Sequence, residues 1–420
     1  MKSLYFAVLL YFLVLLNFMD CSQDSPTDSQ PEKHEQIKIN LINEINQKGR
    51  PGEPLENPVT IQAVNTLQQP VKGVSLKIQI NRGDGELLLN NERSSVFNVV
   101  SDSIGMADIF WILGNEIDNF LEITVAEYGY ISEPLLLSAV AKPPNEVLLL
   151  SFRWIETHEF QFPHVLPPYY VEYDGHVLES NHFLTFSDAS TDDIRLEFAT
   201  LAESSFLEIL EEFEIQNGNE LGIVDNNSKV KIYTRKNFDK QPQQYTFSYG
   251  FFLYGKDSEW QKIWYPGGYT RFNNEIKHEV MHMVQFLMGV HYDMCDDWFM
   301  EGIAEEISGG AHIPITTVAQ LEAWLANPTY SVNPIDIRTT NDYPDPYLET
   351  SPAYYPMFHL IMSYLLNDIG FGKNYIDVKL MFEEIAVTNN FNEAFHNNFG
   401  ITTESLKDSL FQHLRQFLTN

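Results

Sequence analysis

The chain has 420 residues, with 26 Lys or Arg against 58 Asp or Glu, so its net charge at pH 7 is −32. This acidity argues against nucleic acid as a partner, because binding phosphate groups needs a basic surface. Hydrophobic residues make up 44% of the chain, which is enough for a sizeable core and excludes global disorder. At about 100–200 residues per domain, the length predicts two to three domains.

The N-terminal segment has the pattern of an export signal. Lys2 precedes an apolar run from Leu4 to Met19, and polar sequence follows, so residues 1–20 are predicted to be a signal peptide. Cys21 lies where a bacterial lipoprotein carries its lipidated cysteine, although Phe18-Met19-Asp20 departs from the small residues of a lipobox. We therefore expect an exported protein, either a cell-surface or outer-membrane lipoprotein tethered to the membrane through Cys21 or a freely secreted one.

Residues 21–36 form a polar, Ser- and Pro-containing linker, and a strand-rich segment covers residues 37–142. Four stretches of that segment largely alternate apolar and polar residues, and turn-forming glycines separate them: PVTIQAV (58–64), VSLKIQI (74–80), ADIFWIL (107–113) and FLEITVA (120–126). Period-two alternation in several short strands predicts an all-β sandwich. Only two cysteines are present, so a disulfide framework is excluded.

This strand-rich segment resembles the bacterial Ig-like domains of the invasin and intimin type. The resemblance rests on the run from residue 58 to the closing Ser138-Ala139-Val140-Ala141. It implies an Ig-like spacer or adhesion module without chemistry of its own. Lys142-Pro143-Pro144 then marks the predicted domain boundary.

Residues 146–420 combine strands with helices and predict an α+β domain. HFLTFSD (182–188) and VKIYTRK (230–236) have the composition of strands, whereas apolar residues recur at steps of three and four from Asp192 to Phe213. Beyond about residue 270 the pattern is mostly helical. The whole chain is thus predicted to be multidomain, with an all-β part followed by an α+β part.

The informative stretch is His278-Glu279-Val280-Met281-His282, inside a helical pattern from Asn274 to Met288. Two histidines four residues apart project from one face of a helix, so both imidazoles can bind one zinc ion. Glu279 follows the first histidine directly, where it can act as the general base that activates water at the zinc.

A second motif lies nearby, in Trp298-Phe299-Met300-Glu301-Gly302-Ile303-Ala304-Glu305. Eighteen residues separate His282 from Glu301, and this spacing resembles that of the gluzincin zinc metallopeptidases, especially the aminopeptidase N-related and peptidase MA-like groups. The resemblance implies a zincin-like metallopeptidase domain at 146–420. It also implies one Zn²⁺ per chain, with Glu301 as the third ligand beside His278 and His282. Glu305, one helical turn further on, would accept the second N–H of the first histidine.

Other residues remain alternatives for these positions. His291, Cys295, Asp296 and Asp297 are chemically able to bind a metal, but none has a recognised spacing. A helix pair that holds no metal is the plainer alternative for the whole motif. The alternative for Glu305 is a solvated helix charge, which we expect more of its neighbour Glu306.

The same families carry a tyrosine that helps to stabilise the oxyanion formed during hydrolysis. In those families this tyrosine lies fifteen residues before a glycine. The glycine that corresponds here is Gly370, which indicates Tyr355, and the adjacent Tyr354 remains an alternative. Either tyrosine can instead be a core residue. His359, one turn further on, is interpreted as a packing or supporting residue.

The substrate is inferred mainly from a missing motif. Aminopeptidases of this group grip a free amino terminus with a G-x-M-E-N strand, and no such string precedes His278. The nearest strand-like stretches, 246–254 and 261–267, lack the Glu-Asn pair, which favours an endopeptidase acting on a peptide or protein bound along an edge strand. An inactive peptidase-like adhesin or binding protein and a zinc hydrolase of a non-peptide substrate are the alternatives.

Overall fold

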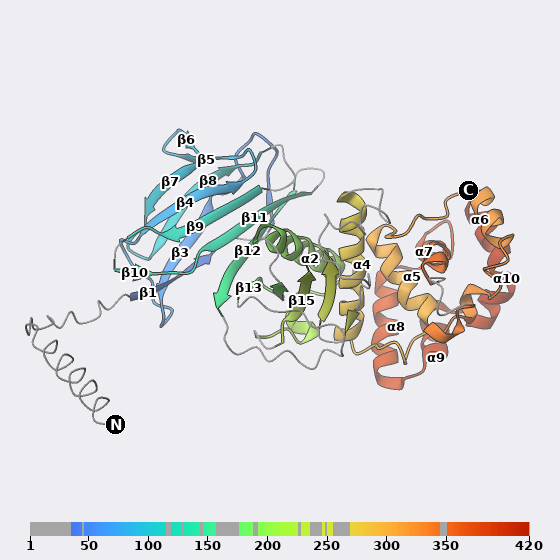
Figure 1. Ribbon diagram of the computed structural model, residues 1–420. Helices are drawn as coiled ribbons and strands as arrows, with labels where there is room; N and C mark the ends of the chain where they lie inside the picture. The colour runs from blue at the N-terminus through green and yellow to red at the C-terminus, as the bar shows by residue number, and fades with distance from the viewer. Residues whose placement is uncertain are drawn as a thin grey trace, which may run out of the picture.

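The computed structural model divides into a strand-rich end and a helical end (Figure 1). It describes residues 35–43, 46–114, 119–127, 129–142, 146–156, 176–187, 192–225, 228–235, 246–247, 250–254, 269–344 and 351–419. The predicted signal peptide, Cys21 and the linker up to residue 34 lie outside these ranges. No helix within them is long and apolar enough to cross a bilayer.

Two sheets build the strand-rich end, and the smaller has the order β10-β1-β3-β8-β5-β6. Its strands are β1 (Glu35–Leu41), β3 (Val59–Asn65), β5 (Glu86–Leu89), β6 (Glu92–Ser94), β8 (Met106–Ile112) and β10 (Tyr130–Ile131). The larger sheet has the order β16-β17-β15-β14-β13-β12-β11-β9-β4-β7, and β2 also pairs with β12. Its strands are β2 (Asn46–Lys48), β4 (Ser75–Arg82), β7 (Val96–Val100), β9 (Asn119–Val125), β11 (Leu135–Lys142), β12 (Glu146–Glu156), β13 (His176–Glu179), β14 (Phe183–Ser187), β15 (Val230–Arg235), β16 (Thr246–Phe247) and β17 (Gly250–Tyr254).

Alternation along the strands explains why the two sheets pack on each other. In β8, Ala107, Ile109 and Trp111 are buried, whereas the intervening Asp108 and Phe110 are exposed. Buried residues of β1, β3, β5 and β8 form one hydrophobic cluster with residues of β4, β9 and β11 from the larger sheet. The four strands expected at 58–64, 74–80, 107–113 and 120–126 are all present. Their Ig-like assignment remains a prediction, because many families share two packed sheets.

The larger sheet runs without interruption from the strand-rich end into the helical end. β11 and β12 are antiparallel neighbours from Lys142↔Glu146 to Leu135↔Arg153, so the predicted boundary lies in the short connection between two paired strands. A further apolar cluster joins residues from both sides of this connection: Phe120, Leu136, Leu148, Leu150, Phe152, Leu178, Leu196 and Ala199. The division into domains at 142/146 remains a prediction, and any such domains share a sheet and a core cluster.

Helices make up most of the chain after residue 269. Among the described residues before that point, one α-helix is present: α2 (Asp192–Glu212) matches the predicted helical pattern and contacts β12, β13 and β14. The described helices that follow are α4 (Tyr269–Leu287), α5 (Asp297–Ser308), α6 (Val318–Leu325), α7 (Ser351–Leu366), α8 (Tyr375–Thr388), α9 (Phe391–Phe399) and α10 (Thr403–Phe417). Short 3₁₀ turns form η1 (Gly218–Leu221), η2 (Pro334–Asp336) and η3 (Thr340–Asp342). Figure 1 places α4 between α2 and the C-terminal helices.

Candidate metal centre

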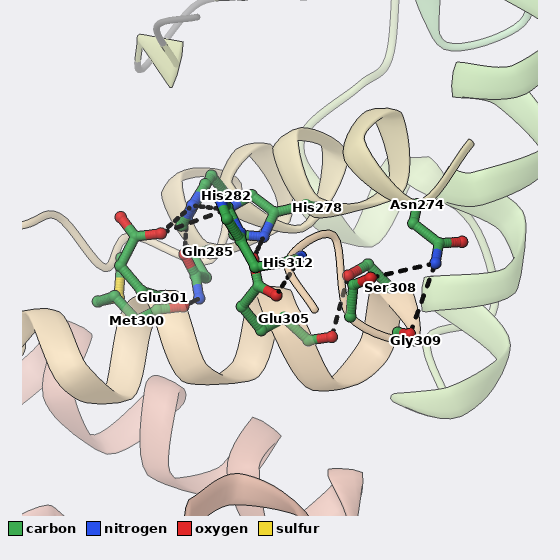
Figure 2. A network of polar contacts seen from close by, with 11 residues as sticks. Asn274, His278, His282, Gln285, Met300, Glu301, Glu305, Ser308, Gly309 and His312 are labelled. Carbon is green, nitrogen blue, oxygen red and sulfur yellow. Dashed lines mark hydrogen bonds and ion pairs between the residues drawn. The ribbon is translucent and has the colours of Figure 1, made fainter. Parts of the chain in front are cut away.

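The predicted ligands lie on two antiparallel helices, α4 and α5, which pack side by side (Figure 2). The apolar stripe of α4 is buried, including Ile276, Val280 and Val284. Helix α5 is buried along almost its whole length. A Cβ at Gly302 would lie 2.6 Å from Cγ of Met362, so this glycine lets α5 pack closely against α7. The two helices therefore hold their side chains in a closely packed interior.

His278, His282 and Glu301 converge on one point inside this interior. The two Nε2 atoms of His278 and His282 are 3.1 Å apart, and each lies 3.2 Å from Oε2 of Glu301. Three ligands on a tetrahedral zinc, at about 2.0–2.1 Å from the metal, are separated by about 3.3 Å from one another. These three form the one His/Cys/Asp/Glu cluster in the described chain whose ligand atoms lie close enough to share a metal ion. The donor set thus fits a buried metal with two nitrogen ligands and one oxygen ligand.

The second ring nitrogen of each histidine faces a different acceptor. Nδ1 of His278 lies 3.1 Å from Oε1 of Glu305, the carboxylate that the resemblance implies for this position. Nδ1 of His282 lies 2.8 Å from Oε1 of Gln285, a residue that the sequence analysis did not select. A donor–acceptor contact at Nδ1 leaves the Nε2 lone pair free for a metal, which is the usual arrangement of metal-binding histidines.

Glu305 also holds His312, which lies in the loop after α5. Oε1 of Glu305 is 2.7 Å from Nδ1 of His312, and Oε2 accepts the backbone N–H of His312 at 3.0 Å. Gly309 and Gly310, with φ of 76° and 81°, turn the chain back after α5 and bring His312 to this position. Nothing in the spacing of the sequence indicated His312.

The two buried carboxylates of the centre, Glu301 and Glu305, have lowered pKa values because histidines lie next to them. Burial would raise the pKa of Glu301, but His282 and His278 lower it to about 2. Burial would likewise raise the pKa of Glu305, but its hydrogen bonds with His278 and His312 lower it well below its usual value. Both carboxylates are therefore ionised at neutral pH, as a metal ligand and a histidine partner need to be.

Glu279 lies between the two histidines on α4 and is only 8% exposed. Burial, the charge of Glu301 and the charge of Glu279 raise the pKa of Tyr292, whose ring lies 5.7 Å from the ring of His282. Burial and the charge of Glu301 also raise the pKa of Tyr343. Tyr292 and Tyr343 therefore belong to the surroundings of Glu301, and no spacing in the sequence pointed to either.

The two candidate tyrosines lie in different environments. The Tyr354 ring is fully buried among aromatic residues, and its hydroxyl lies 3.4 Å from both the N–H and the carbonyl of Val332. The Tyr355 ring lies 6.1 Å from the ring of His278 and 4.6 Å from that of His312. Burial and the carboxylate of Glu301 raise the pKa of Tyr355 well above its usual value, so its phenol stays protonated and able to donate. This placement favours Tyr355 over Tyr354 as the residue beside the metal centre.

None of the alternative ligands belongs to the described cluster of close ligand atoms. His291 is exposed and its ring stacks on Phe286 at 5.5 Å, while Cys295 is a buried core residue. Burial raises the pKa of Asp296 to about 6 and that of Asp297 to about 8. A carboxyl with a raised pKa gives up its proton less readily, which makes it a poorer metal ligand.

The expectation that Glu306 is a solvated charge is wrong. Its Oε2 lies 3.0 Å from Nε2 of His359 and accepts a hydrogen bond from the hydroxyl of Ser363. Glu306 therefore ties α5 to α7, because both partners belong to α7. His359 thus takes part in the contact between α5 and α7.

Comparisons with known proteins give only distant likeness. No protein-family model matches the chain, and no curated protein matches it. Aminopeptidase A of Legionella pneumophila, in complex with aspartic acid, is 11% identical with a TM-score of 0.33, and the match covers 89% of this chain and 50% of that one. The chain thus spans half of the length of that protein.

Two further solved structures are similarly distant. An aminopeptidase N family protein from Idiomarina loihiensis is 8% identical with a TM-score of 0.29, covering 90% of this chain and 73% of that one. A conserved protein of unknown function from Bacillus anthracis is 9% identical with a TM-score of 0.29, covering 91% and 81%. Likeness at this level establishes neither a family nor an activity for this chain.

Proposed function

We propose that the protein is a zinc-dependent metallopeptidase that hydrolyses peptide bonds as an endopeptidase. The observation that carries the proposal is the triangle formed by Nε2 of His278, Nε2 of His282 and Oε2 of Glu301, with sides of 3.1–3.2 Å. Two nitrogen atoms and one carboxylate oxygen so placed would serve as the three protein ligands of a catalytic zinc site, with the fourth position left open for water.

Each residue of the centre has a defined task in this proposal. His278, His282 and Glu301 hold the metal, and a bound zinc would polarise the scissile carbonyl and make water more acidic. Glu279 takes a proton from the attacking water and later passes it to the leaving amine. The protonated hydroxyl of Tyr355 donates a hydrogen bond to the developing oxyanion. Glu305 orients His278 by accepting from its Nδ1.

An extended peptide is the substrate that this arrangement supports best. Strands β16 and β17 contact α4, and β16 ends the described order of the larger sheet. An edge strand next to the metal helix offers backbone groups that can pair with a peptide. Since no G-x-M-E-N string precedes His278, recognition of a free amino terminus is not expected.

The proposal extends to the location of the enzyme. The pattern of residues 1–20 supports export, with either a lipid anchor on Cys21 or free secretion. The substrate would then be a peptide or protein outside the cytoplasm. The strand-rich end would serve as an Ig-like spacer.

Hydrolysis of casein by purified full-length protein tests this function. We expect activity that a chelator abolishes and added zinc restores. Glu279→Gln should keep its fold and its zinc but lose about 10²–10⁴ in rate, because the amide cannot accept the proton. Full activity of Glu279→Gln would contradict the proposal. Zinc binding by a parent protein that hydrolyses no peptide would favour a non-peptide hydrolase or an inactive binding protein.

A further inference from the structure

Gln285 occupies an unusual position for a polar side chain. It lies on α4, three residues after His282, and is fully buried at 0% exposure. A buried amide has to satisfy both its oxygen and its NH₂ group, because each unsatisfied polar atom is costly. Gln285 meets this demand with two contacts, one to a predicted metal ligand and one to the neighbouring helix.

The contacts themselves define which way the amide points. Nε2 of Gln285 donates to the carbonyl of Met300 at 3.0 Å, and a carbonyl can only accept. The amide oxygen Oε1 therefore faces Nδ1 of His282, at 2.8 Å. Since Oε1 can only accept, Nδ1 of His282 must carry the hydrogen and donate it. The neutral form of His282 then has its lone pair on Nε2, which faces His278 and Glu301.

We propose that Gln285 is a positioning residue of the metal centre, an inference that rests on the proposed function. It selects the tautomer of His282 that can bind a metal, and it joins this ligand to the peptide unit directly before Glu301. The two histidines are thus held differently, His278 by the anionic Glu305 and His282 by a neutral amide (Figure 2). One side chain thereby connects ligands from both helices.

A second contact between α4 and α5 provides a matched control. Nδ2 of Asn274 lies 3.3 Å from the carbonyl of Gly310 and 3.5 Å from that of Gly309, at the opposite end of the helix pair (Figure 2). Like Gln285, Asn274 is an amide side chain on α4 that donates to backbone carbonyls. The acceptor of Gln285 lies within α5, and those of Asn274 lie just after its end. Unlike Gln285, it has no described contact with His278, His282 or Glu301. Losing it should loosen the helix pair without disturbing a ligand.

The test measures zinc affinity of the full-length chain by competition with a chromophoric chelator. Gln285→Met keeps the length of the side chain but removes both contacts, and we expect zinc affinity to fall about 10–100-fold, the usual effect of losing such a partner. Gln285→Glu keeps an acceptor for Nδ1 of His282 but cannot donate to Met300, so its affinity should stay close to that of the parent. Asn274→Ala should bind zinc like the parent, whatever it does to the melting temperature.

The assignment of Gln285 as a positioning residue is supported if Gln285→Met binds zinc weakly while Gln285→Glu and Asn274→Ala bind it like the parent. If Gln285→Met does not fold, retained zinc binding by Gln285→Glu supports it. Parent-like affinity of Gln285→Met would overturn it. Equal losses in Gln285→Met and Asn274→Ala, or in the Met and Glu variants, would also overturn it, because helix packing would then be the cause. A parent protein that binds no zinc would instead refute the proposed function.

Discussion

Glu305 holds His312 through both carboxylate oxygens: Oε1 lies 2.7 Å from Nδ1 of His312, and Oε2 accepts its backbone N–H at 3.0 Å. The same Oε1 lies 3.1 Å from Nδ1 of His278. One buried carboxylate therefore serves a predicted metal ligand and the loop that carries His312, whose ring lies 4.6 Å from the ring of Tyr355. Replacing it should affect metal binding and loop order together.

We expect Glu305→Ala to lower zinc affinity about 10–100-fold, because His278 loses the acceptor of its second N–H. His312→Ala is the matched comparison, since it frees the loop but leaves Glu305 available to His278. Its zinc affinity should change by less than about threefold, because the partner of His278 remains in place. Chelator competition measures both. Equal losses in the two variants would mean that Glu305 acts through the loop rather than on His278.

Tyr355→Phe should lower the rate of peptide hydrolysis by about 10²–10³, the usual cost of removing one oxyanion donor, while zinc content stays unchanged. Tyr354→Phe should retain activity, since the hydroxyl of Tyr354 contacts the backbone N–H and carbonyl of Val332. Steady-state kinetics with one peptide substrate compares them. A larger loss of rate in the Tyr354 variant would reverse the assignment of the two tyrosines.

Zinc affinity should fall as the pH decreases. In the metal-free protein, burial would lower the pKa of His278, but hydrogen bonds with Glu301 and Glu305 raise it well above its usual value. Below that raised pKa His278 is protonated, so zinc must displace a proton to bind its Nε2, which costs up to about tenfold in affinity per pH unit for one proton. Calorimetric titration in buffers of different ionisation enthalpy counts the protons released. Binding without proton release near neutrality would contradict this expectation.

The fragment 146–420 should be less stable than the full chain and prone to aggregate. Its first strand, β12, would lose β11 as a partner and expose one edge. The cluster that contains Leu148 and Phe152 would also lose Phe120 and Leu136. A fragment that begins at residue 119 keeps β9 and β11 and should behave better in thermal melting and size-exclusion chromatography. A monomeric 146–420 fragment as stable as the full chain would show that the helical end folds alone.

The core of the metal centre could be predicted because helix geometry is local. Residues four apart share a face, so the sequence alone brings His278 and His282 together, and the resemblance to the gluzincin pattern implies Glu301 as the third member. The partners of these ligands could not be found in this way. Gln285 meets Met300 only because α4 and α5 are antiparallel, and His312 reaches Glu305 only after the turn at Gly309.

The fold was predictable to a similar extent. Alternation of apolar residues indicated strands such as β3 and β8, whose pattern depends on one buried face. The continuity of the larger sheet from β11 to β12 was not visible, because Pro143-Pro144 has the composition of a linker and strand pairing leaves no mark on composition. Because β11 pairs with β12, the strand-rich and helical ends of the molecule share the cluster that contains Phe120 and Phe152.

We propose that His278, His282 and Glu301 hold one zinc ion, and the zinc content of purified full-length protein shows whether they do. Elemental analysis after zinc loading and dialysis should give about one zinc per chain in the parent, as three protein ligands and an open position predict. The same measurement on Glu301→Ala should give much less. A parent chain that retains no zinc, or a Glu301→Ala variant that retains as much as the parent, would mean that these three residues do not form a zinc site.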